Sequence, residues 1–398
     1  MNRSVRHRMR GNCHRQLIAG LLLRTLVVAA VFSAVSSGTH ADSSATDRAA
    51  LRDSLAHAAL LRDRALLGSQ AMAIVTSLTT EVGPRLAGSV AEARAREWAV
   101  KKLTGLGLQP IWTEDFEMSA WQRHSERAEV IMPFPQPLAV TALGGSVSTS
   151  AAGVTGEVVL FESLAALRAA PREGVEGKIV YVGHTMQRTQ DGSSYGYFNP
   201  VRTAGPSVAA QKGALAYLLR SIGTDSHRLP HTGSLRYTED APQIPALALS
   251  NPDADQVERI LADRGELVVK LQVQTSLNPT AQSANVIAEI RGHAAPEEVV
   301  VIGAHLDSWD LGTGAVDDGA GVGITMAAMA LIKEANLVPR RTIRLVLWGA
   351  EEVGLLGALA YRDQHRAELA DHVIGSCLLY TSDAAADSLR VDLGGRRI

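Results

Sequence analysis

The sequence predicts an α/β protein whose main part is a three-layer α/β/α sandwich, interrupted by a β-rich insert. Apolar runs at 299–303 and 342–348 flank a helical pattern at 319–335, and this order indicates a β-α-β unit. Between 145 and 273, short apolar segments alternate with Gly-rich turns. A right-handed crossover would lay the two C-terminal strands parallel.

The remaining elements follow from the same periodicities. Before the insert we expect helices at 49–68, 70–78 and 90–106 and a strand at 109–114. Inside the insert we expect strands at 157–161, 178–182 and 214–219, with a helix that starts near Pro206. We therefore predict a main domain over 69–144 and 274–376 and an inserted domain over 145–273.

The first 41 residues have the order of a secretory signal. A basic segment with Arg3, Arg6, Arg8, Arg10 and Arg15 comes before an apolar run from Leu26 to Val35, and Thr39-His40-Ala41 offers a cleavage site. The run is too short for a stable membrane span, and Arg24 would be costly in lipid. We expect an exported protein, secreted or periplasmic, with 42–68 as a spacer or propeptide. An uncleaved N-terminal anchor is the alternative.

Charge and cysteine content exclude two kinds of site. The formal net charge is −2, and loss of the six arginines in 1–41 would take it to −8, so no basic face is available for nucleic acid. The two cysteines, Cys13 and Cys377, lie in the signal segment and in the C-terminal tail. No disulfide and no thiolate zinc site is expected between them, and metal ligands must be His, Asp and Glu.

The first candidate segment directly follows the strand at 299–303. His305 lies where open α/β sheets bind their ligands, at the carboxyl end of a strand. Asp307, two residues later, would hold the imidazole in one tautomer, as carboxylates do for metal-bound histidine. A His-x-Asp pair by itself is common and indicates little.

Two pairs of acids complete the pattern. Asp317 and Asp318 open a helix, and Glu351 and Glu352 follow a strand. Capping explains Asp318 as well as a functional role does. For Asp317 we prefer a metal bridge, because adjacent carboxylates with no Lys or Arg nearby need a cation. One glutamate can ligate a metal while the other acts as general base. His-Glu-x-x-His does not occur.

At this point the residues resemble a known family. GAHLDSWDLGTGAVDDGAG (303–321) and RTIRLVLWGAEEVGLLGA (341–358) are similar to the core of the co-catalytic di-zinc exopeptidases, and within them to the carboxypeptidase Q subgroup. The likeness extends to EVGPRLAGS (81–89), RTAGPSVAAQKGALAYLLRS (202–221) and PHTGSLRY (230–237). It covers roughly 70–375.

The resemblance implies two zinc ions per complete site, with His305 as a ligand of one, Glu352 of the other, and Asp317 as the bridge. Glu351 becomes the general base, Asp307 orients His305, and the Asp317–Asp318 bond is expected to be cis. Two such ions, roughly 3.5 to 4 Å apart, polarise the scissile carbonyl. The insert resembles a protease-associated domain that flanks the site without supplying ligands. The implied substrates are short peptides, chiefly dipeptides, and His231 is a candidate substrate contact.

The C-terminal tail departs from this pattern. The family supplies a further Asp, expected near position 379, and a later His, but Leu379 stands there and neither ligand is found. The run over 377–398 resembles translated vector or adapter sequence, and we interpret it as an artefactual tail on an incomplete peptidase domain. A chain ending naturally at Ile398 would bind zinc weakly and have little or no activity.

Two alternatives stay open at the level of sequence. A di-zinc aminopeptidase of the same family differs only in which end of the peptide it holds. A non-catalytic binding protein on the same scaffold is of another class, and the presence of His305, Asp317, Glu351 and Glu352 argues against it. The sequence does not determine the oligomeric state, so a homodimer also stays open.

Overall fold

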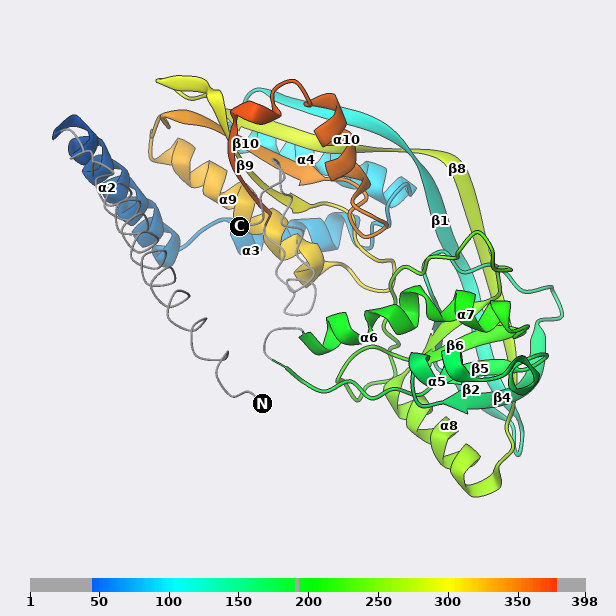
Figure 1. Cartoon of the computed structure of the whole chain (residues 1–398). Helices are drawn as coiled ribbons and strands as arrows, with labels where there is room; N and C mark the ends of the chain where they lie inside the picture. Colours follow the sequence, from blue (N-terminus) through cyan, green and yellow to red (C-terminus); the bar gives the residue numbers. More distant parts are fainter. Residues whose placement is uncertain (1–44, 190–192, 378–398) are drawn as a thin grey trace, which may run out of the picture. The chain divides into compact units, whose positions relative to one another are not determined.

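The computed structural model describes residues 45–189 and 193–377 (Figure 1). The chain divides into two compact units, Met1–Arg62 and Asp63–Ile398, and each is described by itself. Helix α2 (Ala45–Leu67) confirms the helix expected at 49–68, and its described side chains are mostly exposed. The expected signal segment, residues 1–41, lies outside the described residues.

The main sheet contains the β-α-β unit expected from the sequence. Strands β9 (Ala295–His305) and β10 (Arg341–Trp348) are parallel, and helix α9 (Gly321–Glu334) connects them. Strand β11 (His372–Cys377) adds to β9 in parallel, whereas β8 (Val268–Ile290) pairs with β10 in antiparallel orientation. The parallel pair confirms the predicted crossover.

Helices cover both faces of this sheet, which confirms the three-layer arrangement. On one face, α3 (Ala71–Ser77), α4 (Val90–Gly105) and α9 share a core with the strands. Ile74, Leu103 and Met326 are examples of fully or almost fully buried members. On the other face, Tyr361 of α10 (Leu356–Gln364) packs against Ile287, Val301 and Val346. The short helical turns are η1 (Leu78–Val82), η2 (Arg172–Gly174), η3 (Ala315–Ala320) and η4 (Leu369–Asp371).

A long two-stranded ribbon links the main sheet to the insert. Strand β1 (Ile111–Met132) pairs with β8 in antiparallel register from Ile111 opposite Ala288 to Met132 opposite Val268 (Figure 1). One end of β8 pairs with β10, and its other end pairs with β4 (Val154–Phe161). The strand expected at 109–114 is therefore the beginning of a much longer one.

The insert has its own buried core, and its strands continue the sheet through the pairing of β8 with β4. Strands β4, β5 (Ile179–Val182), β6 (Ala216–Arg220) and β7 (Ala246–Leu249) run parallel, which confirms the three strands expected there. The short strands β2 (Gln136–Leu138) and β3 (Val140–Ala142) pair with β1 and β7. The helices that alternate with these strands are α5 (Leu164–Ala169), α6 (Ser193–Thr203), α7 (Gly205–Gln211) and α8 (Asn251–Arg264). The domain limits given above stay a prediction.

Two further sequence expectations meet the structure here. In the described part of the chain, one helical stretch, Ala315–Glu334, is long and apolar enough to span a membrane, but 56% of its most apolar window is buried. Core packing of α9 accounts for that composition. Cys377, which we assigned to the tail, is the last residue of β11 and lies opposite Gly303 of β9. Residues 378–398, including Leu379, lie outside the described residues.

Candidate metal centre

The three candidate segments meet at one edge of the main sheet. His305 ends β9, and the loop with Glu351 and Glu352 begins just after Trp348 ends β10. Because the two strands are parallel, both ends lie at the same edge, next to the turn η3 that carries Asp317. One side-chain ligand atom from each of His305, Asp317 and Glu352 lies within 4.8 Å of the others. The structure therefore brings together the three residues that the family resemblance implies as metal ligands.

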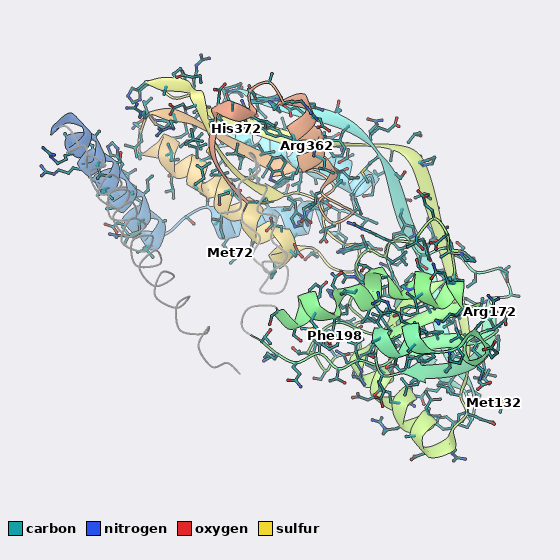
Figure 2. The ribbon with its side chains drawn as sticks, in the orientation of Figure 1. Met72, Met132, Arg172, Phe198, Arg362 and His372 are labelled. Atoms are coloured by element: carbon teal, nitrogen blue, oxygen red, sulfur yellow. The ribbon has the colours of Figure 1, made fainter. Side chains whose placement is uncertain are left out.

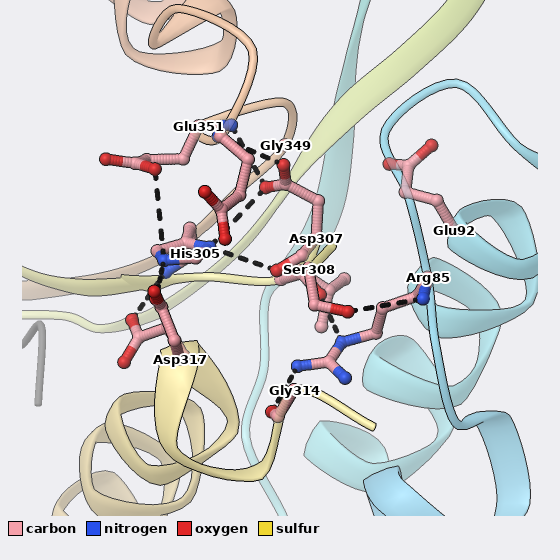
Figure 3. Close-up of polar contacts among 12 residues, drawn as sticks. Arg85, Glu92, His305, Asp307, Ser308, Gly314, Asp317, Gly349 and Glu351 are labelled. Atoms are coloured by element: carbon pink, nitrogen blue, oxygen red, sulfur yellow. Dashed lines mark hydrogen bonds and ion pairs between the residues drawn. The ribbon is translucent and has the colours of Figure 1, made fainter. Parts of the chain in front are cut away.

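His305 is held on both sides of its ring (Figure 3). Its Nε2 lies 2.9 Å from Oδ1 of Asp317, and its Nδ1 lies 3.0 Å from the backbone oxygen of Asp307. Burial disfavours the charged ring, but the hydrogen bonds to Asp307 and Asp317 outweigh it and raise the pKa of His305 well above its usual value. A Nδ1–H that donates to the carbonyl leaves Nε2 as the metal-facing nitrogen.

The two aspartates of η3 have different roles in the structure. The bond between Asp317 and Asp318 is cis, as the resemblance implies. Asp318 is buried, and its carboxylate accepts hydrogen bonds from the backbone N–H of His305 at 2.9 Å and of Gly321 at 3.2 Å. Asp318 thus joins the end of β9 to the start of α9, whereas the side chain of Asp317 remains 35% exposed beside His305.

Asp307 acts on this site in a way that differs from the expected contact. Its backbone oxygen, not its carboxylate, is the hydrogen-bond acceptor for His305, and its Oδ1 lies 3.6 Å from Nδ1. The carboxylate accepts the backbone N–H groups of Glu351 at 3.0 Å and Glu352 at 3.2 Å. Asp307 therefore positions two groups: its backbone oxygen holds the imidazole of His305, and its carboxylate holds the loop that carries both glutamates.

Glu352 is the residue whose surroundings most clearly suit a bound cation. Its Oε1 is buried and has no hydrogen-bond partner among the described residues, although buried polar atoms are nearly always paired. Burial, together with the neighbouring acids Asp317, Asp307 and Glu351, raises the pKa of Glu352 well above its usual value. One imidazole and two carboxylates are ligands that zinc accepts, and a cation there would satisfy the buried oxygen. The residues therefore fit a zinc ion.

Sequence reasoning missed Arg85, which lies among these acids (Figure 3). We expected no Lys or Arg near the carboxylates, but the fully buried Arg85 comes from the loop before α4. Its guanidinium donates to the backbone oxygens of Leu306 at 2.5 Å, Thr313 at 2.6 Å and Gly314 at 2.9 Å. Arg85 thereby fixes the loop between His305 and Asp317. The GPR turn was visible in the sequence, but its contacts span more than 200 residues.

His231 lies on the insert. Its Nε2 is 3.0 Å from the hydroxyl of Tyr195, and the two rings meet edge to face. Surrounding protein atoms and the charge of Arg202 lower the pKa of His231, and Asp317 acts in the opposite direction, but the side chain itself is exposed to solvent. His231 is thus close enough to Asp317 for their charges to interact.

Comparison with known proteins agrees with this geometry. Residues 285–375 match the family model "Peptidase family M28". Carboxypeptidase Q from Bos taurus is 38% identical over 74% of this chain and 61% of its own length, and that from Homo sapiens is 36% identical over 77% and 63%. The chain thus spans a little over 60% of these curated relatives.

Solved structures show the same relationship. A peptidase M28 precursor from Shewanella amazonensis SB2B superposes with a TM-score of 0.79 at 39% identity, with 85% of each chain covered. An aminopeptidase from Aneurinibacillus sp. strain AM-1 superposes with a TM-score of 0.55 at 20% identity, over 78% of this chain and 69% of its own. The second comparison shows a shared fold.

Proposed function

The chain belongs to peptidase family M28, and from this premise we propose that the protein is a zinc-dependent exopeptidase that hydrolyses short peptides, chiefly dipeptides. The observation that carries the proposal is the buried, unpaired Oε1 of Glu352 beside His305 and Asp317. In this proposal His305, Asp317 and Glu352 hold zinc, and a complete site holds two ions. Held by these residues, zinc would supply the positive charge that polarises the scissile carbonyl and stabilises its developing negative charge.

Glu351 is the general base of the proposed reaction. Its carboxylate lies 3.9 Å from Nε2 of His305 and is 20% exposed, so water can reach it beside the proposed ligands. Because Asp307 fixes the backbone of Glu351, the carboxylate is positioned to take a proton from the attacking water. The same carboxylate then returns the proton to the leaving amine.

Which end of the peptide the enzyme cleaves is proposed from the relatives. The carboxypeptidase Q relatives favour a carboxypeptidase or dipeptidase. The alternative is an aminopeptidase, and a "Probable leucine aminopeptidase 2" is 29% identical over 69% of this chain. We further propose that residues 1–41 export the protein, that 145–273 form a protease-associated-like domain, and that 69–144 and 274–376 form the peptidase domain. Separate hydrophobic cores support two parts, but Ala128, Leu138 and Ala142 pack in the core of the insert rather than in that of the peptidase domain.

Peptide hydrolysis after removal and return of zinc tests the proposal. The substrates are a series of free dipeptides, an N-blocked dipeptide and an aminoacyl-anilide, and the 398-residue chain is assayed beside a version that carries the source gene's own sequence beyond residue 376. We expect zinc-dependent cleavage of free dipeptides by the second version. Cleavage of the anilide would instead indicate an aminopeptidase. No zinc-dependent turnover by either version would favour a non-catalytic binding protein.

Zinc binding by the printed chain is a separate measurement. A chelated sample titrated with zinc should bind it through His305, Asp317 and Glu352, and Glu352→Gln should weaken binding by about 10- to 100-fold or more, because a charged ligand is lost. Equal zinc affinity for the variant would contradict the assignment of Glu352 as a ligand.

A further inference from the structure

The loop that joins His305 to Asp317 is held from two sides, and one of them is the insert. On the side of the main sheet, the guanidinium of Arg85 donates to three backbone oxygens of this loop. In the middle of the loop, Trp309 and Asp310 instead contact the β1 ribbon and the segment that follows it. The reaction proposed above makes no use of these two residues.

Arg123 of β1 holds Asp310 through a forked contact. The Nε of Arg123 donates to Oδ2 of Asp310 at 2.8 Å, and its Nη2 donates to Oδ1 at 3.1 Å. Two parallel hydrogen bonds between a guanidinium and a carboxylate fix direction as well as distance. The side chain of Arg123 is 7% exposed and that of Asp310 is 25% exposed. Water therefore screens this ion pair less than one on an open surface.

The other contacts of Arg123 anchor it to the insert. Strand β1 leaves the main sheet and ends at Met132, which lies in the insert (Figure 2). Part of the way along this strand, Nη1 of Arg123 donates to Oε2 of Glu126 at 3.0 Å and to the backbone oxygen of Ala142. Its Nη2 also donates to the hydroxyl of Thr232 at 3.2 Å. One guanidinium thus joins the insert to the loop of the proposed metal site.

Trp309 adds a close steric contact beside this ion pair. A Cβ on Gly144 would lie 2.2 Å from Cη2 of Trp309, so the indole ring packs directly on the backbone of this glycine. The N–H of Gly144 donates to the backbone oxygen of Gly233 at 2.9 Å. The next residue, Ser234, donates from its hydroxyl to the backbone oxygen of Glu352 at 3.1 Å. The insert therefore contacts both loops that carry the proposed ligands.

We propose that Arg123 is a positioning residue of the metal centre: through Asp310 it holds the loop between His305 and Asp317 on the insert. A loop without helix or strand moves readily unless contacts hold it, and a shift of about 1 Å near a reacting group costs about 100-fold in rate. The proposal rests on the proposed function and goes beyond it, because it gives the insert a part in catalysis that requires no metal ligand from it. No covalent step involves Arg123.

A double-mutant cycle on Arg123 and Asp310 tests the proposal. Hydrolysis of a free dipeptide is measured with zinc-loaded protein that carries the source gene's own sequence beyond residue 376. Arg123→Gln and Asp310→Asn should each lower kcat by about 10- to 100-fold and leave KM almost unchanged, because the loop shifts. The double variant should lose little more than either single variant, since all three lack the same contact.

Hydrogen exchange measures the position of the loop without any turnover. The 398-residue chain is used free of zinc, and mass spectrometry follows the amides of 306–314. Arg123→Gln and Asp310→Asn should each speed this exchange by about 10-fold and leave β9 protected, because only the loop loses its hold on the insert. Zinc titration of the same variants should show an affinity about 10-fold lower than in wild type.

Three further changes keep the test interpretable. Gly144→Ala displaces Trp309 without altering any charge, and it should reproduce the faster loop exchange and the lower kcat. Arg123→Lys keeps the charge but loses the fork, so it should restore part of kcat. The matched control combines Arg220→Gln with Asp255→Asn, an ion pair inside the insert whose arginine is also 7% exposed. It should leave kcat and loop exchange unchanged, and circular dichroism checks the folding of each variant.

The outcomes separate this proposal from the proposed function. If wild type hydrolyses the dipeptide but the effects of Arg123→Gln and Asp310→Asn on kcat simply add, the positioning role is overturned and the peptidase function stands. If no version hydrolyses it but loop exchange and zinc affinity depend on the Arg123–Asp310 pair, the positioning role stands and the catalytic proposal fails. Loop exchange equal to wild type in both single variants would overturn the positioning role.

Discussion

The main sheet and the insert contain similar parallel strands but treat charge differently where those strands end. In the insert, Arg220 at the end of β6 is paired with Asp255 and Glu258, and Ser250 after β7 accepts the backbone N–H of Asp253 as the N-cap of α8. In the main sheet, the ends of β9 and β10 carry His305 and the Glu351–Glu352 pair, with Asp317 beside them. The same strand geometry thus places paired opposite charges at the strand ends of the insert and a cluster of acids at those of the main sheet.

The difference teaches that charge balance, more than fold, distinguishes a site from a scaffold. Carboxylates that face one another raise each other's pKa unless a cation offsets them. Arg85 offsets part of this negative charge, but its N–H groups donate to backbone oxygens and not to the carboxylates. Arg202 is the opposite case, a buried cation of the insert without an acidic partner among the described residues. The uncompensated charges of the two regions are the places where ligands of opposite charge are expected.

Neutralising one glutamate in each region gives the largest contrast in activity. Glu351→Gln should lower kcat by about 100- to 10,000-fold, because the general base is lost, and should leave stability almost unchanged. Glu258→Gln, its matched variant in the insert, should change kcat little and lower the free energy of unfolding by about 1 kcal/mol, since Arg220 loses a partner. Steady-state kinetics and urea unfolding check both. Equal activity of Glu351→Gln and wild type would refute the base assignment.

Removal of Arg85 tests whether the main site depends on this buried guanidinium. Arg85→Met should lower the free energy of unfolding by about 3–5 kcal/mol, because four backbone oxygens lose a buried charged donor. Zinc affinity should fall as well, since the loop from Leu306 to Gly314 is no longer fixed. Urea denaturation and zinc titration measure the two effects. A variant as stable as wild type would show that the acids, not Arg85, dominate the local energetics.

Glu92 gives the main region a pH dependence with a definite sign. Burial raises the pKa of Glu92 from 4.5 to about 7, against the effects of Arg96 and Ser283. The folded state therefore binds more protons than the unfolded state between these values, and stability falls as pH rises from about 4.5 to about 7. The loss amounts to about 3 kcal/mol at most.

Glu92→Gln should remove this contribution and keep an oxygen acceptor for Ser283. The difference in melting temperature between pH 5 and pH 8 should therefore be smaller in the variant than in wild type. An unchanged difference would mean that Glu92 is ionised alike in the folded and unfolded protein.

The smallest expected effect lies in the insert. His184 is 3% exposed and stacks on Phe198 at 4.8 Å between ring centroids, and neither of its ring nitrogens has a hydrogen-bond partner in the part of the chain that the structure describes. Burial, with the charge of Arg220, lowers the pKa of His184 from 6.5 to about 4, so wild type loses stability as pH falls through this range. His184→Phe should gain about 1 kcal/mol at pH 7, because two unpaired polar atoms are removed.

The gain from His184→Phe should grow as pH falls from 6.5 to 4, and thermal unfolding at several pH values measures it. A variant less stable than wild type at every pH would show that the larger ring does not fit.

The sequence by itself determined the elements and the three polar segments of this protein. Apolar periodicity located β9, α9 and β10, because the apolar residues of a helix recur at helical spacing and those of a buried strand form a continuous run. Parallel strands end at one edge, so the convergence of His305, Asp317 and Glu352 followed from local pattern plus one topological rule. The resemblance added the cis bond between Asp317 and Asp318.

Only the tertiary structure decided which partners these groups have. The backbone oxygen of Asp307 contacts the imidazole while its carboxylate holds the Glu351–Glu352 loop. Arg85 reaches acceptors more than 200 residues away, and Arg202 is left with one side of its guanidinium unpaired. Such contacts join segments far apart in the chain, and no periodicity records them. Burial then determines how much each of these contacts contributes to stability, because a charge removed from water must be compensated by the groups that the fold places beside it.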